Sequence, residues 1–399
     1  MIEKALAELT LNITDGKHGD CRGKDDSGYY FISCKDIREG QIHYEDARQI
    51  IEEDFWDTHK RTQLEPDDIL VTNSGTIGRM AFVRDVPLTY RTTFQKSVAI
   101  VKPDKAKIFP KYLYYQLQNC VDDFINRSNG AAQKNLLLST MRAFKMNIHE
   151  DEDLQMHIAA ILSAYDDLIE NNQKQIKLLE EAAQRLYKEW FVDLRFPGHE
   201  TTPIVDGIPQ GWERMVLSEV TSVLKRGISP KYSDNGKYSV INQKCIRSSI
   251  MDISESRRQE KEYVPTLNLQ DSDTVICSTG TGTLGRVGRV YGDYPNTTFD
   301  SHVTLVRAKE NPNYIYHVVK SQQEYLMGMG RGSTNQQELY RDVIERLVVL
   351  CPSQDILLKA DRVLNAIHCK IKAVYLQNNL LVESRDRLLP KLMSGELEV

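Results

Sequence analysis

The chain contains two copies of one sequence pattern in the same order. Matching blocks are residues 6–10 with 217–221, 31–38 with 240–247, 74–83 with 281–290, 92–94 with 297–299, and 129–137 with 331–339. The offset between the copies falls from 211 residues in the first block to 202 in the last. A long period with small changes of offset is typical of a duplicated domain whose loops differ in length. The sequence therefore predicts two similar heads, head 1 over residues 1–150 and head 2 over residues 205–352.

After each copy, the apolar residues change from a period of 2 to alternating steps of four and three. This spacing predicts two long amphipathic helices, each about 37 residues and hence about 55 Å long. The residues expected to pair are Ile158, Leu162, Tyr165, Ile169, Ile176, Leu179 and Leu186 on the first helix, and Leu364, Ile367, Ile371, Val374, Leu381 and Leu388 on the second.

Antiparallel pairing of the two helices is the simplest interpretation, and docking of each apolar stripe on its own head is the alternative. Asn172 and Asn378 interrupt the stripes, where an asparagine either fixes the register or is solvated.

The expected chain order is head, helix, linker, head, helix. We place the boundaries at 1–150 for head 1, 151–196 for the first spacer helix, 197–212 for a Pro- and Gly-rich linker, 205–352 for head 2 and 353–399 for the second spacer helix. The predicted fold class is α+β, with two pseudo-twofold-related α/β domains separated by two long antiparallel helices that form a coiled coil. Two similar heads on a rod suit a two-part target, and double-stranded DNA is the obvious one.

The composition restricts where such a target could bind. There are 51 Lys and Arg against 56 Asp and Glu, a net charge of −5, so a nucleic-acid surface has to be local. The seven cysteines show no C-x-x-C spacing, which disfavours a disulfide framework or a zinc site, and no metal site is expected. No run of eighteen apolar residues occurs, so a soluble, cytoplasmic protein without membrane contact is expected.

The segment GTGTLG, residues 280–285, has the spacing of the dinucleotide-binding fingerprint. That fingerprint needs a helix after the glycines, whereas the residues that follow alternate as in a strand. The first copy has Asn73, Gly75 and Gly78 at what we take to be the matching positions, so the first glycine is missing there. We therefore interpret both segments as hairpin turns and disfavour a nucleotide-dependent enzyme.

Two further motifs are weak indications of catalysis. The sequence NPNY at residues 311–314 departs from the N-P-P-[YF] motif of adenine methyltransferases at its third position and is typical of a turn. Pro66-Asp67 is not followed by the acidic-x-Lys pattern of a metal nuclease. We expect a non-catalytic chain.

Comparing the two copies divides candidate DNA contacts into two classes. Residues that agree, as expected for backbone contacts or docking loops, are Lys35 with Lys244, Arg38 with Arg247, Thr76 with Thr283, and Arg79 with Arg286. Scaffold ion pairs are the alternative for each of these pairs. Residues of base-reading type that differ between equivalent loops are Lys96, Gln133 and Lys134 in the first copy, and His302, Asn335 and Gln336 in the second.

The chain resembles the specificity (S) subunits of type I restriction-modification enzymes over essentially its whole length. The residues that carry the resemblance are LLPKLMSGEL at 388–397, IPQGW at 208–212, and the duplicated G-T-[IL]-G-R and glycine-glutamine loops. The resemblance implies that each head is a target-recognition domain for half of a bipartite DNA sequence, and that the helix pair sets the spacer. A coiled-coil scaffold without sequence-specific DNA contact is the competing hypothesis.

The same resemblance implies partners and cofactors outside this chain. Two methyltransferase (M) subunits would bring S-adenosylmethionine and methylate adenine, and restriction (R) subunits would bring ATP and Mg for translocation and cleavage. One S chain per complex is expected, with no cofactor of its own. The low net charge suits a chain that holds DNA only together with these partners.

Overall fold

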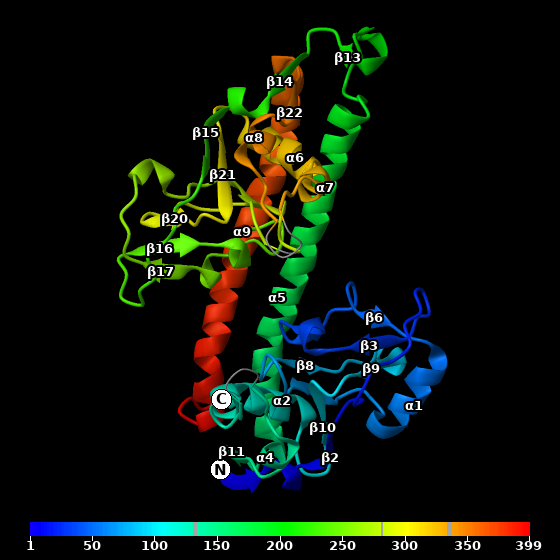
Figure 1. The fold of residues 1–399 in the computed structure, drawn as a ribbon. Coiled ribbons are helices and arrows are strands. Elements are labelled where there is room, and N and C mark those ends of the chain that lie inside the picture. The colour runs from blue at the N-terminus through cyan, green and yellow to red at the C-terminus, as the bar shows by residue number, and fades with distance from the viewer. Residues whose placement is uncertain (131–133, 281, 333–336) are drawn as a thin grey trace. The chain divides into compact units, whose positions relative to one another are not determined.

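The computed structural model describes residues 1–130, 134–280, 282–332 and 337–399 (Figure 1). The chain divides into two compact units, and each is described by itself. Unit 1 comprises Met1–Glu170 and Asn379–Val399, and unit 2 comprises Asn171–Asn378. Each unit therefore holds one head and a segment of each long helix. In the described ranges, no helix is both long enough and apolar enough to cross a membrane.

Head 1 is built around a four-stranded antiparallel sheet and a three-stranded mixed sheet. The first has the order β2 (Thr10–Asp15), β10 (Val98–Pro103), β7 (Ile69–Thr72), β8 (Met80–Phe82), and the second β6 (Arg48–Gln49), β3 (Tyr30–Ile32), β9 (Thr92–Phe94). Two short pairs are β1 (Ile2–Ala5) with β11 (Lys145–Ile148), and β4 (Ile37–Arg38) with β5 (Gln41–Ile42). The helices are α1 (Glu52–Thr62), α2 (Pro110–Asn119), α3 (Val121–Asn126) and α4 (Leu138–Arg142), with 3-10 turns η1 (Leu6–Glu8), η2 (Cys34–Asp36) and η3 (Thr89–Arg91).

Head 2 repeats the order of both sheets and the pair of β1 with β11, whereas its described residues hold no counterpart of α1 or of the β4–β5 pair. Its sheets have the orders β15 (Thr221–Arg226), β21 (Val303–Ala308), β18 (Thr274–Cys277), β19 (Val287–Arg289), and β17 (Arg257–Gln259), β16 (Tyr238–Ile241), β20 (Thr297–Phe299). A short pair joins β14 (Glu213–Val216) to β22 (Val348–Cys351). The helices are α6 (Pro312–Ser321), α7 (Gln323–Gly328) and α8 (Arg341–Glu345), with 3-10 turns η6 (Leu217–Glu219), η7 (Gln243–Cys245), η8 (Ile253–Glu255) and η9 (Pro265–Leu267). The predicted duplication and mixed α/β content are thus present in the structure.

The central strands separate two apolar layers in each head. In β7, Ile69 and Val71 pack in the cluster that contains α2, whereas Leu70 between them packs against Ile32 of β3. Alternate side chains of a strand point to opposite faces, so a strand buried on both faces requires the continuous apolar run seen here. In β18 the same alternation places Ile276 and its neighbours in separate clusters.

A close approach of backbones holds the two sheets of each head together at one end. A Cβ atom on Gly16, just after β2, would overlap the carbonyl group of Phe94 in β9. Gly227, just after β15, meets the carbonyl of Phe299 in β20 in the same way. Only glycine fits at either place.

The GTGTLG segment lies in a hairpin, as the sequence indicated. β18 pairs antiparallel with β19, and β7 pairs with β8 in the same way, so a strand and not a helix follows the glycines. Gly280 and Gly285 have φ angles of 104° and 76°, which side chains disfavour. These glycines therefore shape a turn.

The residue matching proposed within this turn was wrong. The amide of Asn73 donates to the Ser97 carbonyl at 3.1 Å, and the amide of Ser278 makes the equivalent bond to His302 at 2.7 Å. Asn73 therefore corresponds to Ser278, and Gly280 corresponds to Gly75. The turn of head 2 is two residues longer, so matching by sequence alone placed Asn73 and Gly75 two residues out of register.

Two long helices follow the heads, α5 (Glu152–Tyr187) and α9 (Gln354–Ser394), of 36 and 41 residues. A π-helical turn, Lys188–Val192, extends α5, and the segment after it holds η5 (His199–Thr201) and a hairpin of β12 (Ile204–Val205) and β13 (Ile208–Pro209). Within unit 2, Asn172 contacts Asn378 while Ile176 and Leu179 share a cluster with Ile371, so the segments run antiparallel.

The thirteen helix positions expected to pair are all buried or half-buried. Their packing combines both interpretations. Leu162 joins the core of head 1 together with Leu392 of α9, and Leu364 joins the core of head 2, whereas Ile371 packs with Ile176 across the helix pair. The stripes thus join the helices to each other and to the heads.

Asn172 and Asn378 bind each other inside unit 2. The Nδ2 atom of Asn172 donates to Oδ1 of Asn378 at 2.9 Å and to Oε1 of Gln377 at 3.3 Å. Asn172 and Asn378 are only 5% and 8% exposed. A buried amide pair of this kind favours one register, because any slip leaves its polar atoms unpaired.

Equivalent positions join each head to its helix with different chemistry. In unit 1 the Tyr115 hydroxyl donates to Asp166 of α5 at 2.7 Å, and Arg385 of α9 pairs with the same carboxylate. The matching positions in the second copy lie 202 residues further along the chain, and they hold His317 in place of Tyr115 and His368 in place of Asp166. The Nε2 atoms of the two histidines lie 3.0 Å apart. Burial lowers the pKa of His317 to about 3 and that of His368 to about 2, so both rings are neutral and one donates to the other.

Candidate nucleic-acid interface

Five loops of head 1 meet where β2, β3, β7 and β9 end, and we call this surface loop edge 1. It comprises residues 16–18, 33–36, 73–79, 95–97 and 134–136. Backbone hydrogen bonds tie the loops together: Lys96 N donates to the Lys17 carbonyl at 3.0 Å, and Leu136 N donates to the Asn73 carbonyl at 2.8 Å. The amide of Cys34 reaches Ser97 Oγ at 3.4 Å. Loops that are far apart in sequence thus form one continuous surface.

Head 2 builds loop edge 2 from the equivalent segments, residues 227–228, 242–247, 278–286, 300–302 and 337–339, in so far as the structure describes them. Asp300 N donates to the Ile241 carbonyl at 2.9 Å, and Leu339 N donates to the Ser278 carbonyl at 2.8 Å. Burial raises the pKa of Asp300, whose Oδ1 accepts the amide of His302 at 2.8 Å. The two heads therefore present the same loops in the same arrangement.

The candidate residues of head 1 gather on loop edge 1 or beside it. Lys35, Thr76, Lys96 and Lys134 are exposed on it, and Arg79 at its border is half-buried. Arg38, on β4, is half-buried, and its Nε atom has no hydrogen-bond partner among the described residues.

Five candidate cations on or beside loop edge 1 differ in their pairing from many other cations of head 1, including Lys17 of the same edge. Within the described ranges, no ion pair involves Lys35, Arg38, Arg79, Lys96 or Lys134. By contrast, many other cations of this head are paired, namely Lys17 with Asp57, Arg22 with Asp54, Arg48 with Asp20, Arg61 with Asp15, and Lys102 with Asp68. Cations without carboxylate partners remain available to a phosphate, which is the geometry that a DNA-binding surface needs.

On loop edge 2, Lys244 and Arg247 are exposed and Arg286 is half-buried. Arg247 lies 4.0 Å from Glu255, a loose contact between exposed side chains that contributes little. The Thr283 hydroxyl is turned inward, because it donates to the Thr279 carbonyl at 3.0 Å. Thr283 thus differs from its exposed counterpart Thr76, which leaves that pair without a shared contact surface.

The exposed ring of His302 binds Thr279 Oγ1 through Nδ1, which leaves Nε2 as its outward-facing atom. Gln133, Asn335 and Gln336 lie outside the described residues.

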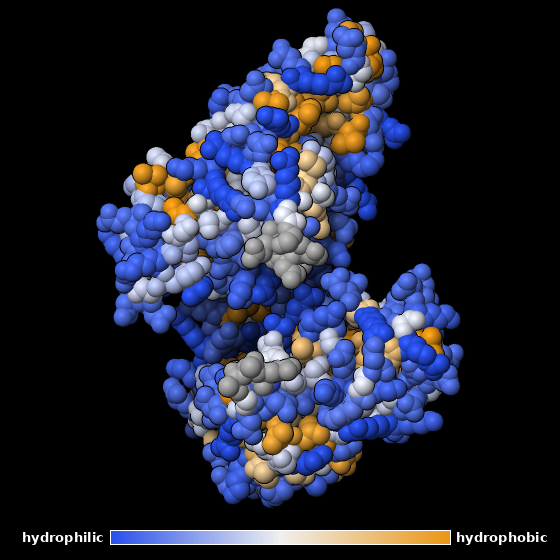
Figure 2. All heavy atoms as spheres, viewed as in Figure 1, coloured by the Kyte–Doolittle hydropathy of each residue, from blue (hydrophilic) through white to orange (hydrophobic). Residues whose placement is uncertain are grey.

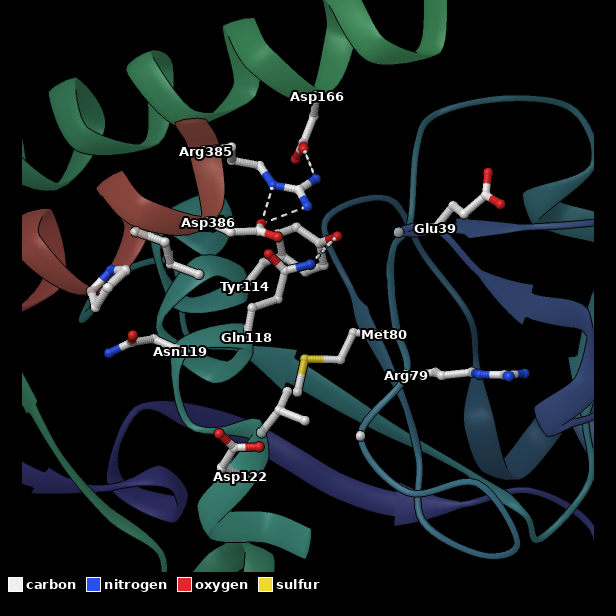
Figure 3. Close-up of a pocket in the computed structure, with 15 residues that line it drawn as sticks. Glu39, Arg79, Met80, Tyr114, Gln118, Asn119, Asp122, Asp166, Arg385 and Asp386 are labelled. Carbon is white, nitrogen blue, oxygen red and sulfur yellow. Dashed lines mark hydrogen bonds and ion pairs between the residues drawn. The ribbon is translucent and has the colours of Figure 1, made fainter. Parts of the chain in front are cut away.

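A cavity of about 570 Å³ in unit 1 adjoins Arg79 (Figure 3). Its walls include Glu39, Asp122 and the ion pair of Asp166 with Arg385. Figure 3 shows the Arg79 side chain pointing away from that ion pair. Among the described residues, Arg79 therefore forms no ion pair with the acidic side chains that line this cavity.

Arg226 was missed by the sequence comparison, although it supports loop edge 2. Its guanidinium group binds the Ser301 carbonyl and forms an ion pair with Glu338, so it links two loops of the edge. Head 1 has Asp15 at the corresponding strand position, where it binds Arg61 of α1 instead. The reversal of charge between Asp15 and Arg226 is a signal visible in the sequence, but among differing positions only loop residues of base-reading type were selected as candidates.

The NPNY segment belongs to the core of head 2. Asn311 has a left-handed φ of 51° before α6, and the Oδ1 atom of the buried Asn313 accepts a hydrogen bond from Arg289 at 2.6 Å. Tyr314 is buried and donates to the Leu350 carbonyl. These residues begin and anchor a helix, where the sequence predicted a turn. Among the described residues, no group of three or more His, Cys, Asp or Glu is placed to hold a metal ion.

Comparison with known proteins agrees with the duplicated architecture. The family model described as type I restriction modification DNA specificity domain matches residues 20–181 and again residues 209–356. The MjaIX specificity subunit of a type I restriction enzyme from Methanocaldococcus jannaschii is 28% identical over 348 residues, which cover 83% of this chain and 78% of that protein. The HindI specificity subunit from Haemophilus influenzae is 21% identical over 376 residues, covering 75% of this chain and 80% of that protein.

Among solved structures, the S subunit of a type I restriction-modification system from M. genitalium has a similar fold. The TM-score is 0.56 at 15% identity, and the match covers 98% of this chain and 96% of that one.

Proposed function

Because the chain belongs to the type I restriction-modification DNA specificity family, we propose that each of its heads reads one half of a bipartite DNA target. The observation that carries this proposal is the pair of equivalent loop edges. In a protein of net charge −5, the described loops of both heads carry cations without ion pairs at equivalent positions, Lys35 and Arg79 in head 1 and Lys244 and Arg286 in head 2. This is the local positive surface that an acidic DNA-binding protein requires.

We further propose a division of labour within each loop edge. Lys35 with Lys244, and Arg79 with Arg286, occupy equivalent positions and would contact phosphates, which fixes how each head docks. Lys96, Gln133 and Lys134 in head 1, and His302, Asn335 and Gln336 in head 2, would contact base edges, because their donors and acceptors differ between the heads.

The helix pair would set the spacer between the half-sites and recruit two methyltransferase (M) subunits. Exposed leucines on both helices support a role in docking: Leu178 is 65% exposed, Leu358 58% and Leu380 64%. S-adenosylmethionine for adenine methylation would come with the M subunits, and ATP and Mg with R subunits, while this chain would hold no cofactor and perform no catalysis.

Exchange of heads tests the proposal. Residues 1–150 or residues 205–352 are replaced with the equivalent head of a relative, and N6-methyladenine is mapped in cells that also carry the methyltransferase partner. Each exchange should change one half of the methylated motif and leave the other half and the spacer intact. If both halves changed together, or if methylation ignored the exchange, the modular model would be wrong and a scaffold role would be favoured.

A further inference from the structure

We propose that head 2 carries an additional phosphate-binding surface, formed by Arg257 and Tyr232, which extends its contact with duplex DNA beyond loop edge 2 and has no counterpart on head 1. The inference rests on the proposed function, because it takes DNA as the partner. It makes the two heads differ in how much of the DNA backbone they contact, a difference that the duplicated fold does not require.

The first observation is a difference in charge between equivalent segments. Residues 15–67 of head 1 and 226–272 of head 2 begin at matched strand positions and end before the matched residues Asp68 and Asp273. Each segment contains 8 Lys and Arg, but the first contains 14 Asp and Glu and the second only 6, which gives net charges of −6 and +2. Head 2 is therefore the more attractive of the two to a polyanion.

The second observation concerns one matched pair of arginines. Arg48 lies opposite Phe31 of β3, and Arg257 lies opposite Val240 of β16, the residue matched to Phe31. Arg48 is neutralised by an ion pair with Asp20.

Arg257 instead lies 3.6 Å from the centre of the Tyr232 ring, and no ion pair to it occurs within the described part of the chain. Stacking on an aromatic face orders the guanidinium group without neutralising its charge, which suits a phosphate ligand.

The third observation is continuity with loop edge 2. β17, which carries Arg257, pairs with β16, and β16 leads into the turn η7, where Asn242 accepts the amide of Lys244 at 2.8 Å. Arg257 thus lies one strand away from a proposed phosphate contact. Figure 2, in the same view as Figure 1, shows mainly hydrophilic residues over β16 and β17.

Duplex DNA suits this surface better than an acidic protein does. A head that docks on a half-site places the flanking sugar-phosphate backbone beside its reading loops, and Arg257 adjoins those loops. Tyr232 is 39% exposed and the Arg257 guanidinium group covers one face of its ring, so it offers little apolar area to a protein partner. An acidic protein face remains the competing occupant and is one outcome of the test.

The test uses the complete chain in complex with its methyltransferase partner. Binding to a short fluorescent duplex that carries the mapped motif, and to the same duplex with both half-sites scrambled, is titrated across a series of salt concentrations. Arg257→Gln should weaken binding to both duplexes and lower the slope of log K against log salt by about one, the value for one lost phosphate contact. Arg257→Lys should keep the slope.

Arg258→Gln is the matched control. Arg258 is the next residue of β17, is equally exposed, and its side chain lies on the opposite face, 3.4 Å from Ser239 Oγ. It should leave both the affinity and the slope unchanged.

Three results would overturn the inference: an unchanged slope for Arg257→Gln, an equal effect of Arg258→Gln, or loss of the methyltransferase partner from Arg257→Gln in the absence of DNA. Failure of the wild-type complex to distinguish the two duplexes would instead count against the proposed function, so the two failures are separable.

Discussion

Removing the amide pair between the long helices tests how the structure fixes their register. Asn172→Ala deletes the donor to Asn378 and to the exposed Gln377, and the buried Oδ1 atom of Asn378 loses this hydrogen bond. A neutral hydrogen bond contributes about 1 kcal/mol net, and a buried polar atom left unpaired costs about 1–3 kcal/mol, so we expect a loss of about 2 kcal/mol. In a unit of this size that lowers Tm by about 4–8 °C.

The assay is thermal unfolding followed by tryptophan fluorescence. Trp190 and Trp212 both lie in unit 2, as the amide pair does, and Trp56 alone lies in unit 1. Asn171→Ala is the control, because this neighbouring asparagine is exposed and should be replaceable without loss.

Replacing both asparagines by leucine should restore the stability, since two apolar side chains leave nothing unpaired. The motif spacer in methylation maps should then become heterogeneous, because the device that selects one register is gone. The reasoning is refuted if Asn172→Ala and Asn378→Ala have independent, additive effects, or if Asn171→Ala costs as much as Asn172→Ala.

Three further predictions follow from other parts of the molecule. Gly227→Ala forces a Cβ into the Phe299 carbonyl and should destabilise head 2 by about 3 kcal/mol or more in urea unfolding, whereas Gly328→Ala, with open space around it, should not. Burial raises the pKa of the Glu180 carboxyl from 4.5 to about 7. The stability that this group contributes is therefore complete below pH 4.5 and is lost as the pH rises through 7. Glu180→Gln should raise Tm at pH 8 and leave Tm unchanged at pH 4.5. Arg226 links two loops of loop edge 2, so Arg226→Gln should make the half-site read by head 2 less specific in methylation maps and leave the other half-site unchanged. Lys225→Gln, at the exposed neighbouring position, should change neither half-site.

The architecture was predictable because duplication and periodicity are global signals. The repeated blocks predicted two heads with the same sheet order, and the apolar stripes predicted two long helices. Each of these features is carried by many residues. The hairpin at Gly280 was predictable from the strand-like residues that follow it.

The residue-by-residue matching of the two heads was less predictable, because it depends on hydrogen bonds that the sequence does not reveal. The two-residue difference between the turns moved Gly280 opposite Gly75, which only the bonds of Asn73 and Ser278 reveal. The buried contact of His317 with His368 was hidden for the same reason, since Tyr115 and Asp166 fill those positions in head 1.

The candidate site was predictable in part. Agreement between the copies pointed to loops that do meet in each head, because the duplicated fold brings equivalent loops together in both copies. Arg226 and Arg257 escaped, since what distinguishes them is the loss of an acidic partner or a reversal of charge at the matched position. Differences in pairing carry as much information as agreement, but they need a structure to become visible.

The most direct test of the account is a genome-wide map of N6-methyladenine in cells that express the neighbouring methyltransferase, with and without this chain. The account predicts one two-part motif that appears only when the chain is present. Methylation that is unchanged or scattered when the chain is added would contradict it.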